Sequence, residues 1–225
     1  FLMPFLVLWG IVTIVFASWF TISQSNIKRF VAYSSISHMG FVVAGMFLLN
    51  KEGLRASIIE MFAHGLTSAS LFMMAGFIYN RLHSFNMHAL RGSIRFMPVF
   101  AFLVGITAFS SMGLPGGSSF WGKFLTIMGA KEYTLQLALL VIAGAFFSVL
   151  YMLYLMKTLY LDTKEEGRLV HFLDLRGFKL LAFLLVVFPM LLVGLFPFLF
   201  FSFFDAYINT LLTQLVKVVG GIPWR

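Results

Sequence analysis

Long apolar stretches separated by short polar loops dominate this sequence from its first residue onward. A helix of about 20 apolar residues is long enough to cross the hydrocarbon core of a bilayer. Seven stretches approach this length, and we expect spans at residues 1–22, 30–49, 56–79, 96–112, 118–130, 135–161 and 180–204. The pattern therefore predicts an all-α polytopic membrane protein with about seven transmembrane helices.

The end of the chain, residues 205–225, has a different pattern from the spans. Its apolar residues recur at helical spacing among polar ones, at Leu211, Leu212, Leu215, Val218 and Val219. This spacing is typical of a short helix that lies in the membrane interface. We therefore expect 180–204 to be the final span and 205–225 to be an interfacial tail.

The stretch 113–124, which reads GLPGGSSFWGKF, interrupts the apolar pattern between the fourth and fifth expected spans. Glycine exposes backbone and proline lacks an N–H group, so both end helices. The residues that predict a helix break here are Gly113, Pro115, Gly116 and Gly117. Freed backbone groups persist within a bilayer only inside protein or beside water. Because Lys123 follows, and a lysine at that depth is costly, we predict an ion path at the break.

Composition supports a membrane protein and excludes several other classes. The chain is 60% hydrophobic and 11% charged, with a mean hydropathy of +0.96, whereas soluble domains have about 25% charged residues. It contains no cysteine, which excludes thiolate zinc and iron–sulfur sites. The net charge of +8 is spread over short loops, as expected for residues that flank spans rather than bind nucleic acid. The loop histidines His83, His88 and His171 share no ligand spacing, so we expect no metal site.

The first residue, Phe1, already lies inside an apolar run. No basic segment or cleavage site of a signal peptide precedes that run. We therefore expect that an initial part of the protein is missing from this sequence.

Ionisable groups within the expected second and third spans are candidates for function. Ser34 and His38 are four residues apart and share one helix face, as do Glu60 and His64. The Glu60–His64 pair is expected to share a proton and act as a relay, because histidine changes charge near neutral pH. The alternatives are a structural ion pair for Glu60 and His64, and hydrogen bonds across a helix interface for Ser34 and His38.

Lys123 has two interpretations as well. A buried lysine beside a helix break can take up and release protons, and Ser118 and Ser119 could carry a proton between it and water. Alternatively, its long side chain could extend to the membrane interface.

Three segments resemble the antiporter-like subunits of respiratory complex I. They are NIKRFVAYSSISHMGFV at 26–42, HGLTSASLFMMAGFIYNRLH at 64–83, and MPVFAF at 97–102 followed by the GLPGGSSFWGKF stretch. The resemblance is greatest to the subunit-4 (chain M) type of NADH:quinone oxidoreductase. The same family includes subunits of Mrp-type Na⁺/H⁺ antiporters and membrane-bound hydrogenases. The resemblance covers nearly all of this chain, but only the C-terminal half of a family member.

The resemblance implies a fold of two five-helix units of inverted topology, each with a broken helix that carries an ionisable residue. Residues 1–22 would then be the last helix of a missing first unit, and 30–161 the complete second unit. It also implies a proton path through Lys28 near the junction of the units, His64 in the following helix, and Lys123 in the broken helix.

Three residues depart from the subunit-4 pattern. Lys123 stands where that type usually has glutamate, Glu60 occupies a position expected to be neutral and polar, and Asn26 replaces the usual aspartate. These departures leave the subgroup open between complex I, a hydrogenase relative and an antiporter.

The function expected from these observations is proton translocation as a pumping subunit of NADH:quinone oxidoreductase. The residues expected to form or support its path are Lys123, Lys28, His64, Glu60 and His38, with Ser34, Ser118 and Ser119. The sequence has no motif for flavin, quinone, haem or an iron–sulfur cluster, so we expect no cofactor and no redox centre in this chain.

The expected partners are membrane lipid and other membrane-arm subunits, while other subunits of the complex handle NADH and quinone. The expected location is a bacterial or archaeal inner membrane. A cation/proton antiporter or hydrogenase subunit is one alternative function, and a structural membrane scaffold is another.

Overall fold

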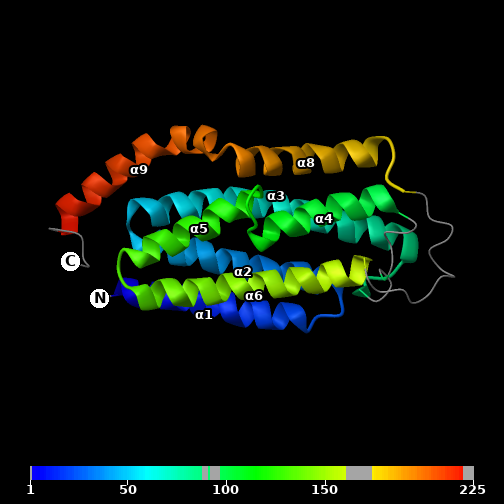
Figure 1. The fold of residues 1–225 in the computed structure, drawn as a ribbon, viewed down its shortest axis with the longest axis horizontal. Helices are drawn as coiled ribbons and strands as arrows, with labels where there is room; N and C mark the ends of the chain where they lie inside the picture. The colour runs from blue at the N-terminus through cyan, green and yellow to red at the C-terminus, as the bar shows by residue number, and fades with distance from the viewer. Residues whose placement is uncertain (1, 88–90, 92–96, 161–173, 220–225) are drawn as a thin grey trace.

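The computed structural model describes residues 2–87, 91, 97–160 and 174–219. Eight helices account for most of this described part of the chain (Figure 1). They are α1 (Leu2–Ile22), α2 (Ile27–Leu48), α3 (Lys51–Leu82), α4 (Pro98–Met112), α5 (Ser118–Lys131), α6 (Leu135–Tyr160), α8 (Phe178–Leu195) and α9 (Pro197–Val219). Several positions named from the sequence lie outside the described residues, namely Phe1, His88, Leu161, His171 and 220–225.

The helices run along one common axis, with α8 along one long side of the bundle and α1 along the opposite side (Figure 1). Five helices of the described part are long and apolar enough to cross a membrane, namely α1, α2, α3, α6 and α8. The all-α membrane fold predicted from the sequence is therefore confirmed.

Helices α4 and α5 have 15 and 14 residues and follow one another in the same direction (Figure 1). At a rise of about 1.5 Å per residue, neither half spans a hydrocarbon core of about 30 Å, but the two together do. The separate spans expected at 96–112 and 118–130 are thus two halves of one broken helix.

Two asparagines begin helices by accepting hydrogen bonds from otherwise unpaired backbone N–H groups. Asn26 Oδ1 accepts from the N–H groups of Lys28 and Arg29, at 3.0 and 3.4 Å, and so caps α2. Asn50 caps α3 by accepting from the Gly53 N–H at 2.8 Å. Asn26 therefore still supplies the oxygen that a capping aspartate would offer at this position.

The last expected span, 180–204, ends earlier than its hydropathy predicts. Helix α8 stops at Leu195, and α9 begins at Pro197 and continues to Val219. Proline lacks an N–H group and disfavours helical geometry in the residue before it, while it fits the first position of a new helix. The segment expected as an interfacial tail from 205 onward therefore begins inside α9 instead of forming a helix of its own.

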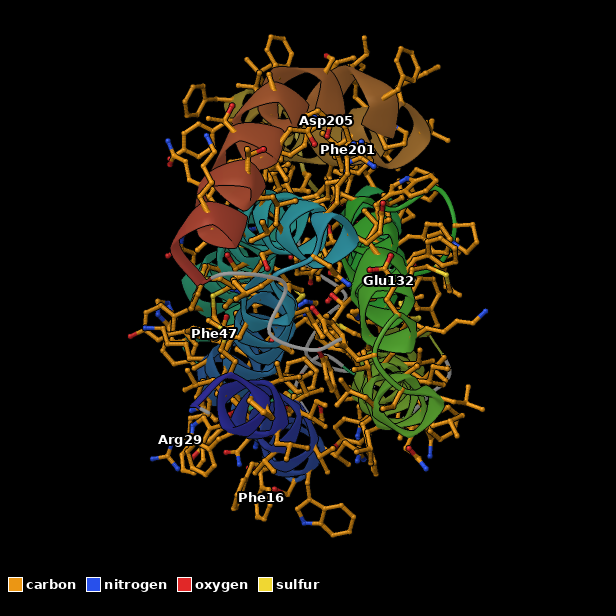
Figure 2. The ribbon with its side chains drawn as sticks, turned by 90° about the vertical axis from the view of Figure 1, so that its left-hand side faces the viewer. Phe16, Arg29, Phe47, Glu132, Phe201 and Asp205 are labelled. Carbon is orange, nitrogen blue, oxygen red and sulfur yellow. The ribbon has the colours of Figure 1, made fainter. Side chains whose placement is uncertain are left out.

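An ion pair joins α9 to α3. Arg55 donates from Nε to Asp205 Oδ1 at 2.7 Å and from a terminal nitrogen to Oδ2 at 2.5 Å. The Arg55 guanidinium also lies 5.4 Å from the centre of the Phe201 ring. Viewed along the helices, Asp205 and Phe201 lie on the side of the bundle opposite Phe16 of α1 (Figure 2). These hydrogen bonds hold the pKa of Asp205 below its usual value.

Helices α1 and α2 cross with their backbones in close contact. A Cβ added to Gly10 would lie 2.8 Å from the Ala44 nitrogen, and one added to Gly40 would lie 2.8 Å from the Gly10 carbonyl oxygen. Small residues allow such close approach between membrane helices. Packing therefore requires glycine at both positions.

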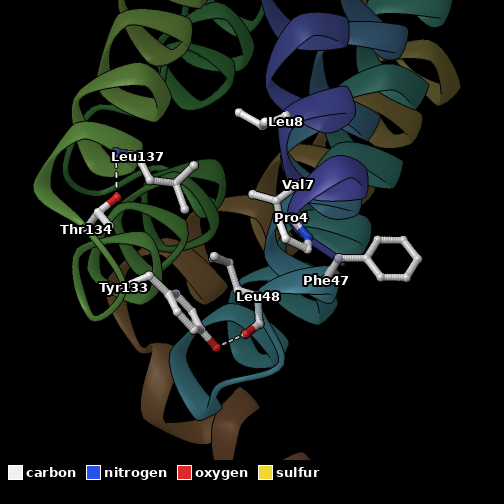
Figure 3. A pocket seen from close by; sticks show the side chains of 8 residues that line it. All are labelled: Pro4, Val7, Leu8, Phe47, Leu48, Tyr133, Thr134 and Leu137. Atoms are coloured by element: carbon white, nitrogen blue, oxygen red, sulfur yellow. Dashed lines mark hydrogen bonds between the residues drawn. The ribbon is translucent and has the colours of Figure 1, made fainter. Parts of the chain in front are cut away.

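An apolar cavity of about 220 Å³ lies beside this pair of helices, at the end of the bundle where α5 turns into α6. Its walls are Pro4, Val7, Leu8, Phe47, Leu48, Tyr133, Thr134 and Leu137 (Figure 3). The Tyr133 hydroxyl donates to the Leu48 carbonyl oxygen across one side of it. This bond ties the end of α2 to the α5–α6 connection.

Candidate functional site

The break between α4 and α5 occupies the predicted positions. Gly113 ends α4 with a φ of 81°, Gly116 has a φ of 96°, and Gly117 precedes the first residue of α5. Positive φ values of this kind favour glycine over residues with a side chain. Helix α8 covers the break, because Gly194 packs directly on the Gly116 carbonyl and Trp121 Nε1 donates to the Gly194 carbonyl at 2.9 Å.

Lys123 is buried one turn into α5, with 3% of its surface exposed. Its Nζ donates to the Ser111 carbonyl oxygen and to Ser148 Oγ, each at 2.6 Å, and lies 5.5 Å from the centre of the Phe41 ring. Ser111 lies in the last turn of α4, where carbonyl groups lack partners within the helix and carry partial negative charge. The break thus solvates the ammonium inside the protein, and the alternative of a lysine that extends to the interface is wrong.

Glu60 and His38 form a buried pair that joins α3 to α2. His38 Nδ1 lies 2.7 Å from Glu60 Oε1, and the two side chains are 2% and 0% exposed. His38 Nε2 lies 2.9 Å from Ser111 Oγ. One histidine therefore connects a carboxylate on one side to a hydroxyl on the other.

His64 is not the hydrogen-bond partner of Glu60 that the four-residue spacing predicted. Its ring instead stacks on the His38 ring, with centroids 5.1 Å apart and planes inclined by 25°. The spacing correctly places Glu60 and His64 on one side of α3, but Glu60 extends across to α2. The second carboxylate oxygen, Oε2, packs against Gly122 of α5 and has no hydrogen-bond partner within the described residues.

Ser111 brings the two ends of this cluster together. Its backbone oxygen accepts from Lys123, and its side-chain hydroxyl contacts His38. Glu60, His38, Ser111 and Lys123 therefore form one buried series across four helices, α3, α2, α4 and α5. The cluster contains a basic, an acidic and an imidazole group, all of which can bind and release protons.

The other residues expected in the proton path lie elsewhere. Lys28 is exposed at the start of α2, with Nζ 4.2 Å from the centre of the Phe85 ring. It precedes His38 by ten residues, or about 15 Å along the helix. Ser34 donates to the Val31 carbonyl of its own helix at 2.8 Å.

The serines expected beside Lys123 do not bond to it. Ser118 Oγ pairs with Ser110 Oγ at 3.2 Å, and Ser119 Oγ is buried without a hydrogen-bond partner among the described residues. The hydroxyl that contacts Lys123 belongs to Ser148 of α6, which the sequence analysis missed together with Ser111. Each is a hydroxyl residue in a largely apolar helix, and that is the signal that could have identified them.

Comparison with known protein families identifies a family with the same sequence pattern. The family described as NADH:quinone oxidoreductase/Mrp antiporter, TM, matches residues 1–151. The chain belongs to this family. The resemblance seen in the sequence motifs is thereby confirmed. All residues of the buried cluster lie within the matched region.

Members of the NADH:quinone oxidoreductase/Mrp antiporter family resemble the chain in sequence. It is 32% identical over 205 residues to NADH-quinone oxidoreductase subunit M of Rickettsia conorii, covering 91% of the chain and 42% of that protein. It is also 32% identical over 208 residues to NADH-ubiquinone oxidoreductase chain 4 of Marchantia polymorpha, covering 92% of the chain and 42% of that protein. The chain thus spans less than half the length of these relatives.

Solved structures show the same fold. A chain of respiratory complex I from Thermus thermophilus with bound NADH matches with a TM-score of 0.86 and 28% identity, covering 98% of this chain and 45% of that one. A chain of the Mrp complex from Dietzia sp. matches with a TM-score of 0.74 and 18% identity, covering 85% of this chain and 44% of that one. The second likeness concerns the fold alone.

Proposed function

We propose that this chain is part of a proton-translocating membrane-arm subunit of NADH:quinone oxidoreductase. The names of the sequence relatives, subunit M and chain 4, support this assignment. The observation that carries the proposal is the double contact of Ser111, which places Lys123 and His38 at one residue in the middle of a bundle. A packing role alone would not require a lysine, a histidine and a glutamate together where burial makes each of them costly.

The chemistry of the series suits transfer in small steps. When His38 donates from Nδ1 to Glu60, its Nε2 accepts a hydrogen bond from the Ser111 hydroxyl. A proton released by Lys123 and bridged by water can bind Nε2, and the proton on Nδ1 can then pass to Glu60. Opposite charges on Lys123 and Glu60 stabilise each other, so each transfer changes the charge balance of the cluster.

His64 extends the series beyond His38, because the two rings stack. Lys28 lies outside the cluster, at the start of α2. It is proposed as a separate proton-exchange site, where protons would pass between the protein and its surroundings. The serines Ser34, Ser118 and Ser119 are proposed to support the path through water rather than by direct contact with Lys123.

The enzymatic role proposed for the chain belongs to the whole complex. Other subunits would bind NADH and quinone and carry out electron transfer, while this chain needs no cofactor for the proton steps. The proposed partners are the other membrane-arm subunits and lipid, and the proposed location is a bacterial inner membrane, because several of the similar proteins come from bacteria such as Rickettsia conorii.

The domain organisation is also a proposal. Residues 1–22 would complete a first repeat unit, and 30–161 would form the second unit with its broken helix. Helix α8 would add the final span, and α9 would carry the tail that was expected from 205 onward. The order of α2 to α6 along the chain, with one helix break between α4 and α5, supports this division.

Replacement of the buried lysine tests the proposal. In membrane vesicles that contain the assembled complex, Lys123→Met should lower NADH-driven proton pumping by at least tenfold, because a general acid–base group contributes about 10²–10⁴-fold. Lys123→Glu should retain part of the activity, since the subunit-4 type that the sequence resembles usually has glutamate at this position. Lys157→Met is the matched control, because it removes an exposed lysine from α6.

Normal pumping by assembled Lys123→Met complexes would refute the proposal. The same vesicles distinguish the antiporter alternative, since a Na⁺/H⁺ antiporter would move protons in response to a sodium gradient without NADH. A sodium-driven signal that Lys123→Met abolishes, with no NADH-driven pumping in the parent, would assign the chain to that branch of the family.

A further inference from the structure

The end of α8 packs against the backbone of the helix break. A Cβ added to Gly194 would lie 2.7 Å from the carbonyl carbons of both Gly116 and Gly117, a separation that real Cβ atoms essentially never show. Gly194 is buried in the last turn of α8. Glycine at this position therefore allows α8 to touch the break directly, and the proton path described above assigns no role to this contact.

A side chain of α5 binds the same residue of α8. Trp121 Nε1 donates to the Gly194 carbonyl oxygen at 2.9 Å. This carbonyl belongs to the last turn of α8, where carbonyl groups lack N–H partners within the helix. The helix ends there because Phe196 leaves helical geometry, with φ −126° and ψ 60°, and Pro197 has no N–H group. The end of α8 therefore supplies a free acceptor, and Trp121 uses it.

The first residue of the break packs on Lys123. Gly113 has a φ of 81°, and a Cβ added to it would lie 2.7 Å from Lys123 Cδ. The Lys123 ammonium donates to the carbonyl oxygen of Ser111, two residues before Gly113. The break 113–117 thus contacts Lys123 at its first residue and α8 at its last two.

Two side chains hold α5 from different directions. Residues two apart in an α-helix are separated by about 200° around its axis, so Trp121 and Lys123 point to nearly opposite sides. Trp121 binds α8, whereas Lys123 binds Ser111 of α4 and Ser148 of α6. The Trp121 hydrogen bond therefore limits rotation of α5, and such a rotation would carry the Lys123 ammonium away from both of its acceptors.

Helix α9 secures the end of α8 from the other side of the α8–α9 connection. Its Asp205 accepts a hydrogen bond from Arg55 of α3 at 2.7 Å, and its Phe200 ring lies 5.2 Å from the Phe62 ring of α3. The segment formed by α8 and α9 therefore bridges α3 and the helix that carries Lys123.

We propose that Trp121 and Gly194 are positioning residues for Lys123. Together they form a clamp, the α8 clamp, which holds the helix break in the arrangement in which the ammonium reaches both of its acceptors. The inference rests on the proposed function, because proton transfer at Lys123 needs these acceptors at hydrogen-bond distance. A displacement of about 1 Å at a reacting group can lower a rate by about 10²-fold, so the clamp controls the transfer without touching the proton.

Removal of the indole N–H group tests the clamp in vesicles that contain the assembled complex. Trp121→Phe keeps an aromatic ring beside Phe120 and Phe124 but removes the donor. It should lower NADH-driven pumping by about three- to tenfold, the factor that corresponds to the loss of one ordinary hydrogen bond. Trp19→Phe is the matched control, because that side chain is 66% exposed on α1 and pumping should match the parent.

A second substitution at Lys123 separates positioning from general damage to packing. In Lys123→Glu a carboxylate replaces the ammonium, and a carboxylate accepts hydrogen bonds but cannot donate one to the Ser111 carbonyl. The clamp then has no such contact to maintain, so adding Trp121→Phe to Lys123→Glu should cause no further loss of pumping. Independent damage would instead lower pumping by the same factor in both backgrounds.

Hydrogen exchange of the full-length protein in detergent decides the cases in which Trp121→Phe does not assemble or Lys123→Glu does not pump. Amides of residues 113–118 should exchange faster in Trp121→Phe and in Gly194→Ala than in the parent, because each variant loosens α8 from the break. Exchange equal to that of the parent in both variants would overturn the clamp.

The outcomes distinguish this inference from the proposed function. Normal pumping in Trp121→Phe and Gly194→Ala, with pumping lost in Lys123→Met, would overturn the clamp and leave the function in place. Equal losses from Trp121→Phe in the parent and in Lys123→Glu would also overturn the clamp. Normal pumping in Lys123→Met would overturn the proposed function, and the clamp with it.

Discussion

Gly122 is the position where a single methyl group should disturb both packing and proton transfer. It lies in α5, one residue before Lys123, and Glu60 of α3 packs directly on it. A Cβ added to Gly122 would lie 2.7 Å from Glu60 Cβ and 3.0 Å from Glu60 Cδ, and still closer to the carboxylate oxygen Oε2. Ordinary contact begins at 3.4 Å, so Gly122→Ala creates a steric conflict between the two helices.

The conflict cannot be relieved by a change of side-chain rotamer alone. Glu60 Cβ is fixed by the backbone of α3, so α3 and α5 must separate by several tenths of an ångström. Overpacking of this kind costs about 1–3 kcal/mol. The carboxylate must also move away from Gly122, which weakens its 2.7 Å contact with His38.

Gly76→Ala is the matched control for Gly122→Ala. Gly76 lies in α3, and a Cβ added there meets no atom within 4 Å. Alanine is favoured over glycine inside a helix by about 1 kcal/mol. The same substitution should therefore stabilise the protein at Gly76 and destabilise it at Gly122.

Thermal unfolding of the full-length protein in detergent measures this difference. Gly122→Ala should lower the unfolding midpoint by several degrees, at about 2–4 °C per kcal/mol for a domain of this size, and Gly76→Ala should leave it equal or higher. Pumping by the assembled Gly122→Ala complex should fall as well. An unfolding midpoint at or above that of the parent for Gly122→Ala would show that the Glu60–Gly122 contact does not constrain the helices, and would refute the reasoning.

Two contacts outside the cluster give further predictions. Asp205→Asn should loosen α9 from Arg55, by about 1 kcal/mol or less for a partly exposed pair, and speed hydrogen exchange of α9 amides at pH 7. Because the pKa of Asp205 is lowered in the fold, the stabilisation by the Arg55–Asp205 pair is present above about pH 4 and is lost as the pH falls through the lowered pKa. Equal hydrogen exchange in parent and variant at pH 7 would contradict this role of the ion pair. Tyr133→Phe should leave the Leu48 carbonyl without its donor and lower the unfolding midpoint by an amount equivalent to about 1–3 kcal/mol, whereas an unchanged midpoint would show that the hydrogen bond contributes no stability.

Hydropathy and length predicted most of the fold because the bilayer restricts what can cross it. The starts and ends of α1, α2 and α6 lie within a few residues of their expected positions. Burial of Lys123 also followed from sequence, since the adjacent glycines and proline break the helix that carries it. The end of α8 did not follow, because the apolar run through Pro197 outweighed the local effect of the proline.

The partner of Glu60 could not be predicted from spacing within one helix. Four-residue spacing shows that Glu60 and His64 share a face, but the rotation and register of α2 against α3 decide which side chain meets the carboxylate. His38 is 22 residues away in sequence and contacts it. Ser148 and Ser111 were missed for a related reason, since hydroxyls in a membrane helix commonly bond to their own backbone and carry little positional information.

The crossing of Gly10 and Gly40 has a mechanical consequence. Because the backbones of α1 and α2 touch at this point, the two helices cannot slide past each other without a steric conflict, and they must move as one rigid body. Ser18 and Ser37 lie on these two helices with their Oγ atoms 2.8 Å apart, so this separation stays constant while neighbouring helices shift. Any movement of α3, α5 or α6 relative to this part of the bundle must therefore take place at their contacts with the rigid pair.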